Sequence, residues 1–245
     1  YEISECLVGS EMCIRDSLSA MPVGEFDRRI VILTKERGKI AAFAKGARRP
    51  NSPLTGITRP FVFGTFQVYE GRTSYTIRQA NITAYFEEII GDFDAVCYAY
   101  YFAELADYYG RENLDAADMI NLLYVAFKAL VNKSLPNELV RYIYEIRLIA
   151  VNGECPDFFS CAGCGSEKEL QLYSYKENGM YCVECAASSG DGIVLQSSTL
   201  YTLQYIITAP LTKLFNFVVK ADVLNELKKA VSYTHLRAHE TLANL

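Results

Sequence analysis

Four cysteines arranged as two C-x-x-C pairs constrain this chain more than any other feature of its sequence. Cys161 and Cys164 form the first pair, and Cys182 and Cys185 form the second after an interval of 17 residues. Two thiolates separated by two residues can approach one ion from a single tight turn, and two such turns complete a tetrahedral shell. Because the spacing is typical of zinc sites, we predict that these four cysteines bind Zn²⁺.

All four positions of the predicted shell are protein thiolates, which leaves no place for water or substrate. We therefore expect the zinc to be structural and not catalytic. Gly163 and Gly165 supply the backbone freedom that the first turn needs. Residues 173–181, which contain the turn-forming pair Asn178 and Gly179, predict a hairpin between the cysteine pairs. A redox-active dithiol and an iron–sulfur cluster, which also uses four thiolates, remain as alternatives.

The rest of the composition limits the class of protein. The chain has 245 residues, of which 51% are apolar, enough for one large domain or for two or three small ones. No apolar run reaches the roughly 18 residues of a membrane span, and the N-terminus lacks the pattern of a secretory signal. The other four cysteines are scattered, whereas a disulfide scaffold would be shorter and denser in cysteine. We therefore expect a soluble cytoplasmic protein that does not bind membranes.

Both ends of the chain have unusual sequences. EMCIRDS near the N-terminus resembles the in-frame translation of a transposon end, and SYTHLRAHET near the C-terminus resembles adapter read-through. We expect residues 1–17 and 232–245 to be gene-assembly artefacts, with natural frayed termini as the alternative. His235 and His239, whose spacing on a helix suits a metal, lie in this tail, and the rest of the chain has no histidine. The rest therefore has no histidine-based acid–base or nucleophile system, and we expect no enzymatic activity.

Positive charge is concentrated in one part of the chain. The net charge is −5, yet residues 24–72 carry ten basic and four acidic residues, a net +6 that leaves −11 for the remainder. Such asymmetry indicates a polyanion-binding module on an acidic body. Cations along a groove neutralise phosphates and release counterions, which gives salt-sensitive affinity that depends little on base sequence. The cations that we expect to contact DNA are Arg28, Arg29, Lys35, Arg37, Lys39, Lys45, Arg48 and Arg49.

Short β-prone runs follow one another through this basic segment. Residues 30–33 are apolar, residues 39–44 mix apolar and basic side chains, and residues 61–69 alternate between the two faces of a strand. Residues 48–60 hold three prolines and predict a long loop. Several short strands within about 55 residues suit a small barrel, and the oligonucleotide/oligosaccharide-binding (OB) fold is the leading candidate.

Aromatic residues are interleaved with these cations. In OB folds some aromatic side chains stack on single-stranded bases, whereas others fill the barrel core. We assign Phe61, Phe63 and Phe66 to the core and leave base stacking open for Tyr69 and Tyr75.

From about residue 84 the hydrophobic period becomes helical. Pro136 suits the first turn of one helix, and Asn152 and Gly153 stop it. The aromatic stripes along these segments are typical of a helix-bundle core. The helices that we predict span about residues 93–108, 114–131, 136–151, 198–209 and 221–231.

An ordered series of motifs resembles one protein family. PVGEFDRR, LTKERGK and FAKGARRP, which begin at residues 22, 33 and 43, resemble the N-terminal domain of bacterial RecO recombination mediators. The similarity continues through the aromatic helices and the four cysteines, over about residues 18–231. It implies an α+β fold with an N-terminal OB-fold β-barrel, followed by an α-helical domain with an inserted four-cysteine zinc finger. The expected boundaries are 18–82 for the OB-fold domain, 83–231 for the helical domain and 158–188 for the zinc finger within it.

The resemblance also implies function. RecO mediators bind single- and double-stranded DNA, anneal complementary strands and help RecA replace single-stranded-DNA-binding protein (SSB). The expected partners are therefore DNA, RecR and the acidic C-terminal tail of SSB, with RecA reached indirectly, in the nucleoid of a bacterial cytoplasm. In the family the SSB tail docks on the helical domain, where Arg141 and Arg147 are candidates for partner binding. Ion pairs on the helix surface or within the domain are the alternative for both arginines.

Two further expectations follow from the same comparison. The first OB strand belongs before Pro22, where the chain has its unusual leader, and the final helix is shortened. A barrel without that strand would expose an unpaired edge. An RNA-binding or translation-associated OB-fold zinc protein remains the alternative in the binding class, and a thiol oxidoreductase is the alternative in the enzyme class.

Overall fold

The computed structural model describes three segments of the chain: residues 10–71, 74–189 and 192–243. Side chains are described throughout these segments except in three short parts: residues 10–17, 188–189 and 233–243. Arg72 and the side chains of His235 and His239 therefore lie outside the described residues. Contacts between residues divide the chain into two compact units, Tyr1–Asn132 and Lys133–Leu245.

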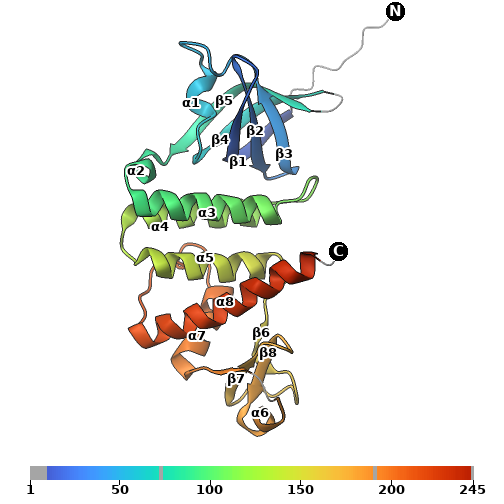
Figure 1. Ribbon diagram of the computed structural model, residues 1–245, viewed down its shortest axis with the longest axis vertical. Coiled ribbons are helices and arrows are strands. Elements are labelled where there is room, and N and C mark those ends of the chain that lie inside the picture. Colours follow the sequence, from blue (N-terminus) through green and yellow to red (C-terminus); the bar gives the residue numbers. More distant parts are fainter. Residues whose placement is uncertain (1–9, 72–73, 190–191, 244–245) are drawn as a thin grey trace, which may run out of the picture. The chain divides into compact units, whose positions relative to one another are not determined.

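Five strands in the first unit form a barrel (Figure 1). The strands are β1 (Ser10–Val23), β2 (Asp27–Thr34), β3 (Gly38–Ala44), β4 (Val62–Glu70) and β5 (Tyr75–Tyr85). Their order is β1-β2-β3-β5-β4, and β4 pairs with β1 to close the ring. The closure between β3 and β5 is narrow, because these parallel strands share two described residue pairs. This order and the narrow closure match the partly open barrel of an OB fold, so the predicted OB-fold barrel is confirmed.

Side chains that alternate along the strands fill the barrel interior. Every second residue of β3 is buried, as expected for a strand with one face toward a core. Leu54 and Ile57, from the short helix α1 (Leu54–Ile57) that follows β3, join the same cluster. The strand residues in this cluster are Ile30, Ile32, Ile40, Ala42, Ala44, Phe66, Val68 and Ile77.

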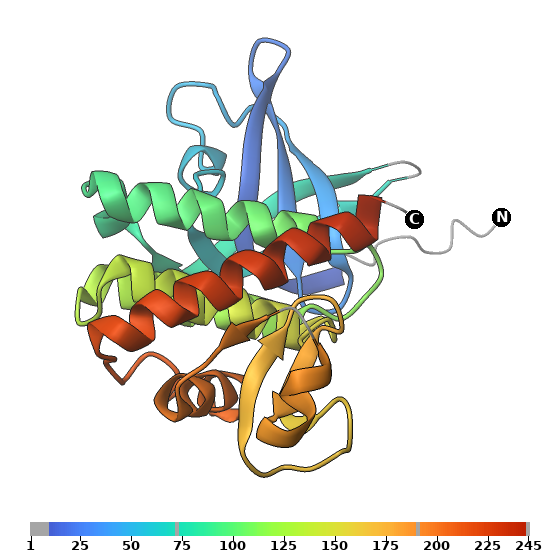
Figure 2. The same cartoon turned by 60° about the horizontal axis from the view of Figure 1, so that its bottom comes forward.

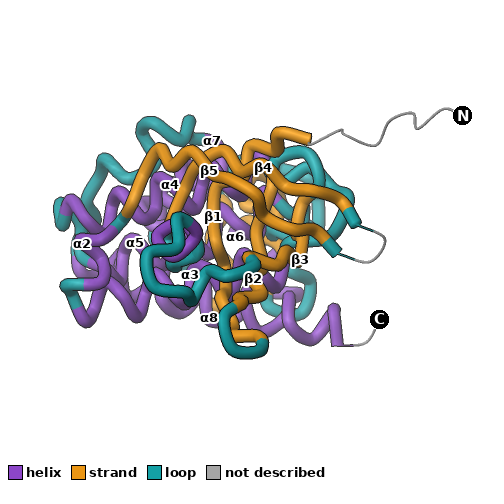
Figure 3. Tube along the Cα trace, turned by 90° about the horizontal axis from the view of Figure 1, so that it is seen from above, coloured by secondary structure: helices purple, strands orange, loops and turns teal. Residues whose placement is uncertain are grey.

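The first strand of the barrel is present, so the expectation of a missing strand was wrong. The N-terminal part of β1 pairs antiparallel with β4 over residues 10–14, and the rest pairs with β2 as far as Val23 (Figure 3). Ladder hydrogen bonds join backbone groups that every residue except proline carries in full. A segment of unusual sequence can therefore still complete the barrel, and no open edge remains between β2 and β4.

Three helices follow the barrel in the first unit: α2 (Glu87–Ile90), α3 (Phe93–Tyr109) and α4 (Ala117–Asn132). Helices α3 and α4 pack against β1, and α4 also packs against β2. The ring of Phe127 in α4 lies 5.2 Å from the ring of Phe61 and 5.8 Å from that of Phe63, centroid to centroid. Phe61 and Phe63 are therefore buried as predicted, but they pack against the helices. Of the three phenylalanines assigned to the core, only Phe66 belongs to the cluster inside the barrel.

The second unit combines helices with a small sheet (Figure 2). Its elements are α5 (Asn137–Val151), β6 (Asp157–Cys161), β7 (Leu170–Ser174), β8 (Gly179–Cys182), α6 (Val183–Ser189), β9 (Ile193–Val194), α7 (Ser197–Thr208) and α8 (Ala221–Ala243). The four strands are ordered β6-β8-β7-β9. Strands β7 and β8 pair antiparallel, so the hairpin predicted between the cysteine pairs is confirmed.

The predicted helices match α3, α4, α5, α7 and α8 in position. Helix α8 extends past the predicted end at Val231, to Ala243. The boundary expected at residues 82–83 remains a sequence-based division, since contacts divide the chain after Asn132. Within the described part of the chain, no helix combines the length and the hydrophobicity that crossing a membrane requires.

Candidate metal centre and nucleic-acid interface

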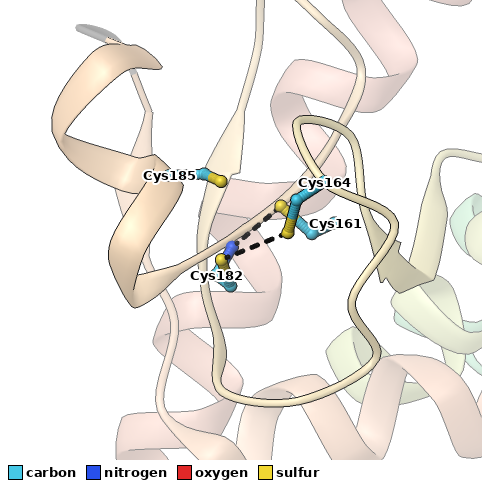
Figure 4. Close-up of side chains that lie close together, drawn as sticks. All are labelled: Cys161, Cys164, Cys182 and Cys185. Carbon is cyan, nitrogen blue, oxygen red and sulfur yellow. Dashed lines mark hydrogen bonds between the residues drawn. The ribbon is translucent and has the colours of Figure 1, made fainter.

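The four predicted cysteine ligands lie together in the second unit (Figure 4). Cys161 ends β6 and Cys164 follows in the next turn, whereas Cys182 ends β8 and Cys185 lies in α6. Their sulfur atoms all lie within 4.8 Å of one another. A tetrahedral shell with metal–sulfur bonds of about 2.3 Å places its sulfurs about 3.8 Å apart. The observed 3.8 Å between the Sγ atoms of Cys164 and Cys182 equals that spacing, so the four thiols could bind one metal ion.

The backbone around the first cysteine pair is shaped to hold a thiolate. The N–H of Gly165 donates to the carbonyl of Cys161 at 2.8 Å, and Gly165 has φ +73°, as the predicted tight turn requires. The N–H of Cys182 donates to the Sγ atom of Cys161 at 3.3 Å. Burial raises the pKa of the Cys161 thiol, but hydrogen bonds from the backbone N–H groups of Cys182, Cys164 and Gly163 outweigh burial and lower the pKa to about 6. Cys161 therefore favours the charged form that metals bind.

A small core supports the metal-binding turns. Phe158 and Tyr173 are buried, with ring centroids 5.3 Å apart. The side-chain amide of Gln204 in α7 donates to the carbonyl of Phe158 at 2.8 Å, which fixes β6 to that helix. Cys155 lies outside the cluster, and its pKa is raised to about 12 by burial and then by the charge of Asp157. Cys155 therefore stays protonated, and the four clustered cysteines make up the candidate centre.

The eight cations predicted to contact DNA all lie in the first unit, near opposite ends of β2. This strand spans eight residues, or about 24 Å at roughly 3.4 Å per residue. Arg29, Lys45, Arg48 and Arg49 lie toward the end where β2 begins, and we call these four the tip cluster. Lys35, Arg37 and Lys39 lie at the other end, around the turn between β2 and β3, and we call these three the far-end cluster. The structure thus separates cations that are close in sequence.

Cations of the far-end cluster are engaged with acidic residues. The Nζ atom of Lys39 donates to the carbonyl of Asp107 at 2.7 Å and lies 3.4 Å from its carboxylate. An Nη atom of Arg37 lies 3.8 Å from the carboxylate of Glu70. Backbone hydrogen bonds from Asn113 to Arg37 also tie the turn to the segment after α3. Two of the three cations therefore have acidic partners within the unit.

Cations of the tip cluster are exposed and form no ion pair among the described residues. The turn between β1 and β2 and the loop after β3 emerge at the same end of the barrel (Figure 2). The backbone N–H of Arg48 donates to the carbonyl of Phe26 at 2.8 Å, and its guanidinium donates to the carbonyl of Gly24 at 3.3 Å. The guanidinium carbon of Arg49 lies 5.3 Å from the ring centroid of Phe26. The tip cluster therefore offers solvent-facing positive charge at one end of the barrel, where a hydrogen bond joins two loops.

Arg28 is the eighth cation, and it contacts the barrel itself. Its Nη1 atom donates to the hydroxyl of Thr58 at 3.0 Å and to the carbonyl of the same residue at 3.3 Å. Thr58 is fully buried at the end of α1. Arg28 therefore joins β2 to α1.

The two arginines predicted to bind a partner lie on α5 and contact groups of their own unit. The Nε atom of Arg141 lies 2.8 Å from the carboxylate of Glu145, whose side chain is fully buried. An Nη atom of Arg147 donates to the carbonyl of Ile206 in α7 at 3.2 Å. The contact of Arg141 matches the alternative of an ion pair, whereas that of Arg147 is a hydrogen bond to the backbone, and neither contact tests partner binding.

A pocket of about 570 Å³ lies between α7 and the segment that leads into α8. Its walls include exposed apolar and aromatic side chains, and Lys220 and Asp222 also line it. No sequence pattern predicted this pocket, because its residues come from two segments that the fold brings together. The apolar and aromatic lining residues are Tyr201, Tyr205, Phe217, Val218 and Val219.

Phe26 is the site residue that the aromatic pattern missed. It lies in a turn between two strands, outside the alternating segments where aromatic residues were sought. The sequence signal was Gly24, two residues before Phe26, because glycine is typical of tight turns whose residues face solvent. Gly24 has φ +58°, as such a turn requires. Tyr75, for which base stacking was left open, is half-buried, and its hydroxyl donates to the carboxylate of Glu70 at 3.4 Å.

Comparison with protein families identifies both halves of the chain. The model described as "Recombination protein O N terminal" matches residues 17–86. The model described as "Recombination protein O C terminal" matches residues 90–238. The second match alone covers more than half of the chain.

Relatives that are named DNA repair protein RecO resemble the chain over most of its length. A protein named DNA repair protein RecO from Acetivibrio thermocellus is 33% identical over 211 residues, which are 84% of this chain and 82% of that protein. Proteins of the same name from Alkaliphilus metalliredigens and Bacillus subtilis are 29% and 27% identical, over 87% and 85% of this chain.

Proposed function

Because the chain belongs to the RecO family, we propose that it is a non-enzymatic DNA repair and recombination mediator. In this role it binds single- and double-stranded DNA, anneals complementary strands and helps load RecA on SSB-coated DNA. The observation that carries the proposal is the tip cluster, whose four exposed cations stand on an OB-fold barrel while the chain as a whole is acidic. Cations in this arrangement bind phosphates and release their counterions, so the affinity for nucleic acid depends little on base sequence.

We propose that the four clustered cysteines hold a structural Zn²⁺ ion. Four thiolates within 4.8 Å of one another suit zinc and leave no open position for a substrate. The ion would join β6, β8 and α6, three short elements that bury few residues of their own. A redox dithiol is less consistent with this arrangement, because all four sulfurs face one another. Slow alkylation of all four thiols in the purified protein, together with tight zinc retention, would support the structural role.

We propose RecR and the acidic C-terminal tail of SSB as partners, with RecA affected indirectly. The pocket beside α7 combines apolar walls with a lining cation, Lys220, a combination that suits an acidic tail, and Asp222 also lines it. Arg141 and Arg147 remain proposed partner contacts, since each side chain is partly exposed beside its intramolecular contact. A location in the cytoplasm, at the nucleoid, fits these partners.

The proposed function is tested by annealing complementary strands that are coated with SSB. We expect the protein to accelerate annealing, and Arg48→Glu with Arg49→Glu to slow it. Binding of single-stranded DNA and of RNA of the same sequence, across a salt series, discriminates the alternative of an RNA-binding OB-fold zinc protein. Preference for RNA with no acceleration of annealing would contradict a role in DNA repair.

A further inference from the structure

Three hydrogen bonds hold the turn that carries Phe26, between β1 and β2. Its carbonyl accepts the backbone N–H of Arg48, and the guanidinium of Arg48 reaches Gly24 at the start of the turn. On the other side of Phe26, the carboxylate of Asp27 accepts the backbone N–H of Gly46 at 2.7 Å. The two loops are therefore joined before any ligand binds, and little ordering remains when a ligand does.

The side chain of Phe26 is exposed at this fixed position. Its exposed fraction is 37%, and it does not belong to the buried cluster inside the barrel. The Arg49 guanidinium lies over the ring at 5.3 Å, a cation–π contact that orients the ring. Met21 and Val23 on the adjoining end of β1 are also exposed, at 59% and 37%. The turn therefore presents an apolar surface whose centre is one oriented aromatic ring.

Charge around this ring suits a phosphate backbone. Arg48 and Arg49 of the tip cluster contact the turn, and the acidic residues of the turn are Glu25 and Asp27. Asp27 is occupied by its hydrogen bond with Gly46, which leaves Glu25 as the acid that faces solvent in the turn. A ligand that fits both features has flat apolar faces joined by negative charges, which is the chemistry of unpaired nucleotides.

We propose that Phe26 stacks on unpaired bases and gives this surface its preference for single-stranded over double-stranded nucleic acid. The proposal rests on the proposed function, because it assigns one contact within the same DNA-binding surface. Bases in a duplex already stack on their neighbours, so their faces are closed to the ring. Phosphates are accessible in both forms. The cations of the tip cluster therefore bind single-stranded and double-stranded nucleic acid alike, whereas Phe26 binds only single strands.

Tryptophan fluorescence tests the stacking contact directly, because the chain has no tryptophan. In Phe26→Trp the single indole reports on the turn, and stacking on a base quenches its emission. We expect titration with a single-stranded oligonucleotide to quench this emission strongly and an equal amount of duplex to quench it little. Phe93→Trp is the matched control: Phe93 is also an exposed phenylalanine of the first unit, at 81%, but it begins α3 and lies outside the barrel. Its emission should change little with either ligand.

Affinity measurements complete the test. Removing the ring in Phe26→Ala should weaken single-strand binding about 5- to 100-fold and change duplex binding less than about twofold. The salt dependence should stay unchanged, because no phosphate contact is lost. Phe26→Leu should behave like Phe26→Ala, and Phe26→Tyr should retain affinity, which separates stacking from folding defects. Equal loss for both ligands, or unchanged affinity without quenching, would overturn the inference alone; a parent chain that binds neither ligand would overturn the proposed function as well.

Discussion

The backbone N–H of Arg48 donates a 2.8 Å hydrogen bond to the carbonyl oxygen of Phe26. This bond joins the loop after β3 to the turn between β1 and β2, two segments that are 22 residues apart in sequence. Because it uses backbone atoms, it leaves the Phe26 ring and much of the Arg48 side chain for other contacts. This end of the barrel therefore has two joined loops whose aromatic and cationic side chains remain exposed.

Charge reversal at the tip cluster should weaken DNA binding. Arg48→Glu combined with Arg49→Glu should lower affinity for both strand forms and flatten its salt dependence, because each lost phosphate contact reduces the logarithmic slope by about 0.7 to 0.9. Binding isotherms across a salt series measure both quantities, and zinc content should stay unchanged. Lys35→Glu with Arg37→Glu is the control at the far end of the barrel, and we expect a smaller effect. A slope that does not change in the tip variant would exclude these arginines as phosphate contacts.

Loss of a metal ligand should cost stability. Cys161→Ser removes a buried ligand, so we expect no stoichiometric zinc and a lower melting temperature, because structural metal binding is coupled to folding. A strong chelator should have the same effect on the parent chain, and more readily at acid pH, where protons compete for the thiolates. Metal analysis and thermal denaturation measure these changes. Cys155→Ser is the control outside the cluster, and full stability in Cys161→Ser would argue against a structural ion.

The turn between β2 and β3 should tolerate no side chain at Gly38. Gly38 has φ +62°, and a Cβ atom there would lie 2.0 Å from the carbonyl oxygen of Arg111. Gly38→Ala should therefore lower the free energy of unfolding by about 2–5 kcal/mol, from backbone strain together with this clash. Gly24→Ala provides the comparison, because Gly24 has φ +58° with no atom within 4 Å of the added carbon. We expect about 1–2 kcal/mol there, from strain alone. Chemical denaturation measures both, and equal losses would show that the clash is relieved.

Arg141 should contribute to stability apart from any role in partner binding. Its Nε atom is 2.8 Å from Glu145, which is fully buried, while the Arg141 side chain remains 42% exposed. Arg141→Ala should lower the free energy of unfolding by about 1–3 kcal/mol, less than for a fully buried pair because solvent screens the exposed cation. Arg141→Ala with Glu145→Gln should recover part of the loss. No change in denaturation midpoint for Arg141→Ala would leave partner binding as the main role of this arginine.

Local chemistry in the sequence was enough to predict several features. The spacing of Cys161, Cys164, Cys182 and Cys185 predicted their convergence, because a C-x-x-C turn directs both thiols to one side whatever surrounds it. Alternation along the strands and the helical period further on predicted the barrel and the positions of the long helices. These signals act over a few residues, and the final structure preserves them.

Other features depended on residues that are distant in sequence. The expected loss of the first strand was wrong, because ladder hydrogen bonds accept segments whose side chains carry no strand signal. The order of the cations in the sequence could not show that Lys39 forms an ion pair with Asp107, or that Arg48 donates a hydrogen bond to Phe26.

The sequence by itself therefore determined which chemistry the chain carries: four thiolates in two turns and a basic segment on an acidic chain. The tertiary structure alone decided which cations stay exposed and which aromatic ring stands among them. The physical reason is the separation along the chain of the residues that interact. Ligand spacing and hydrophobic period follow from bond geometry between near neighbours, whereas exposure and pairing are set when strands and loops far apart in the chain close into a barrel.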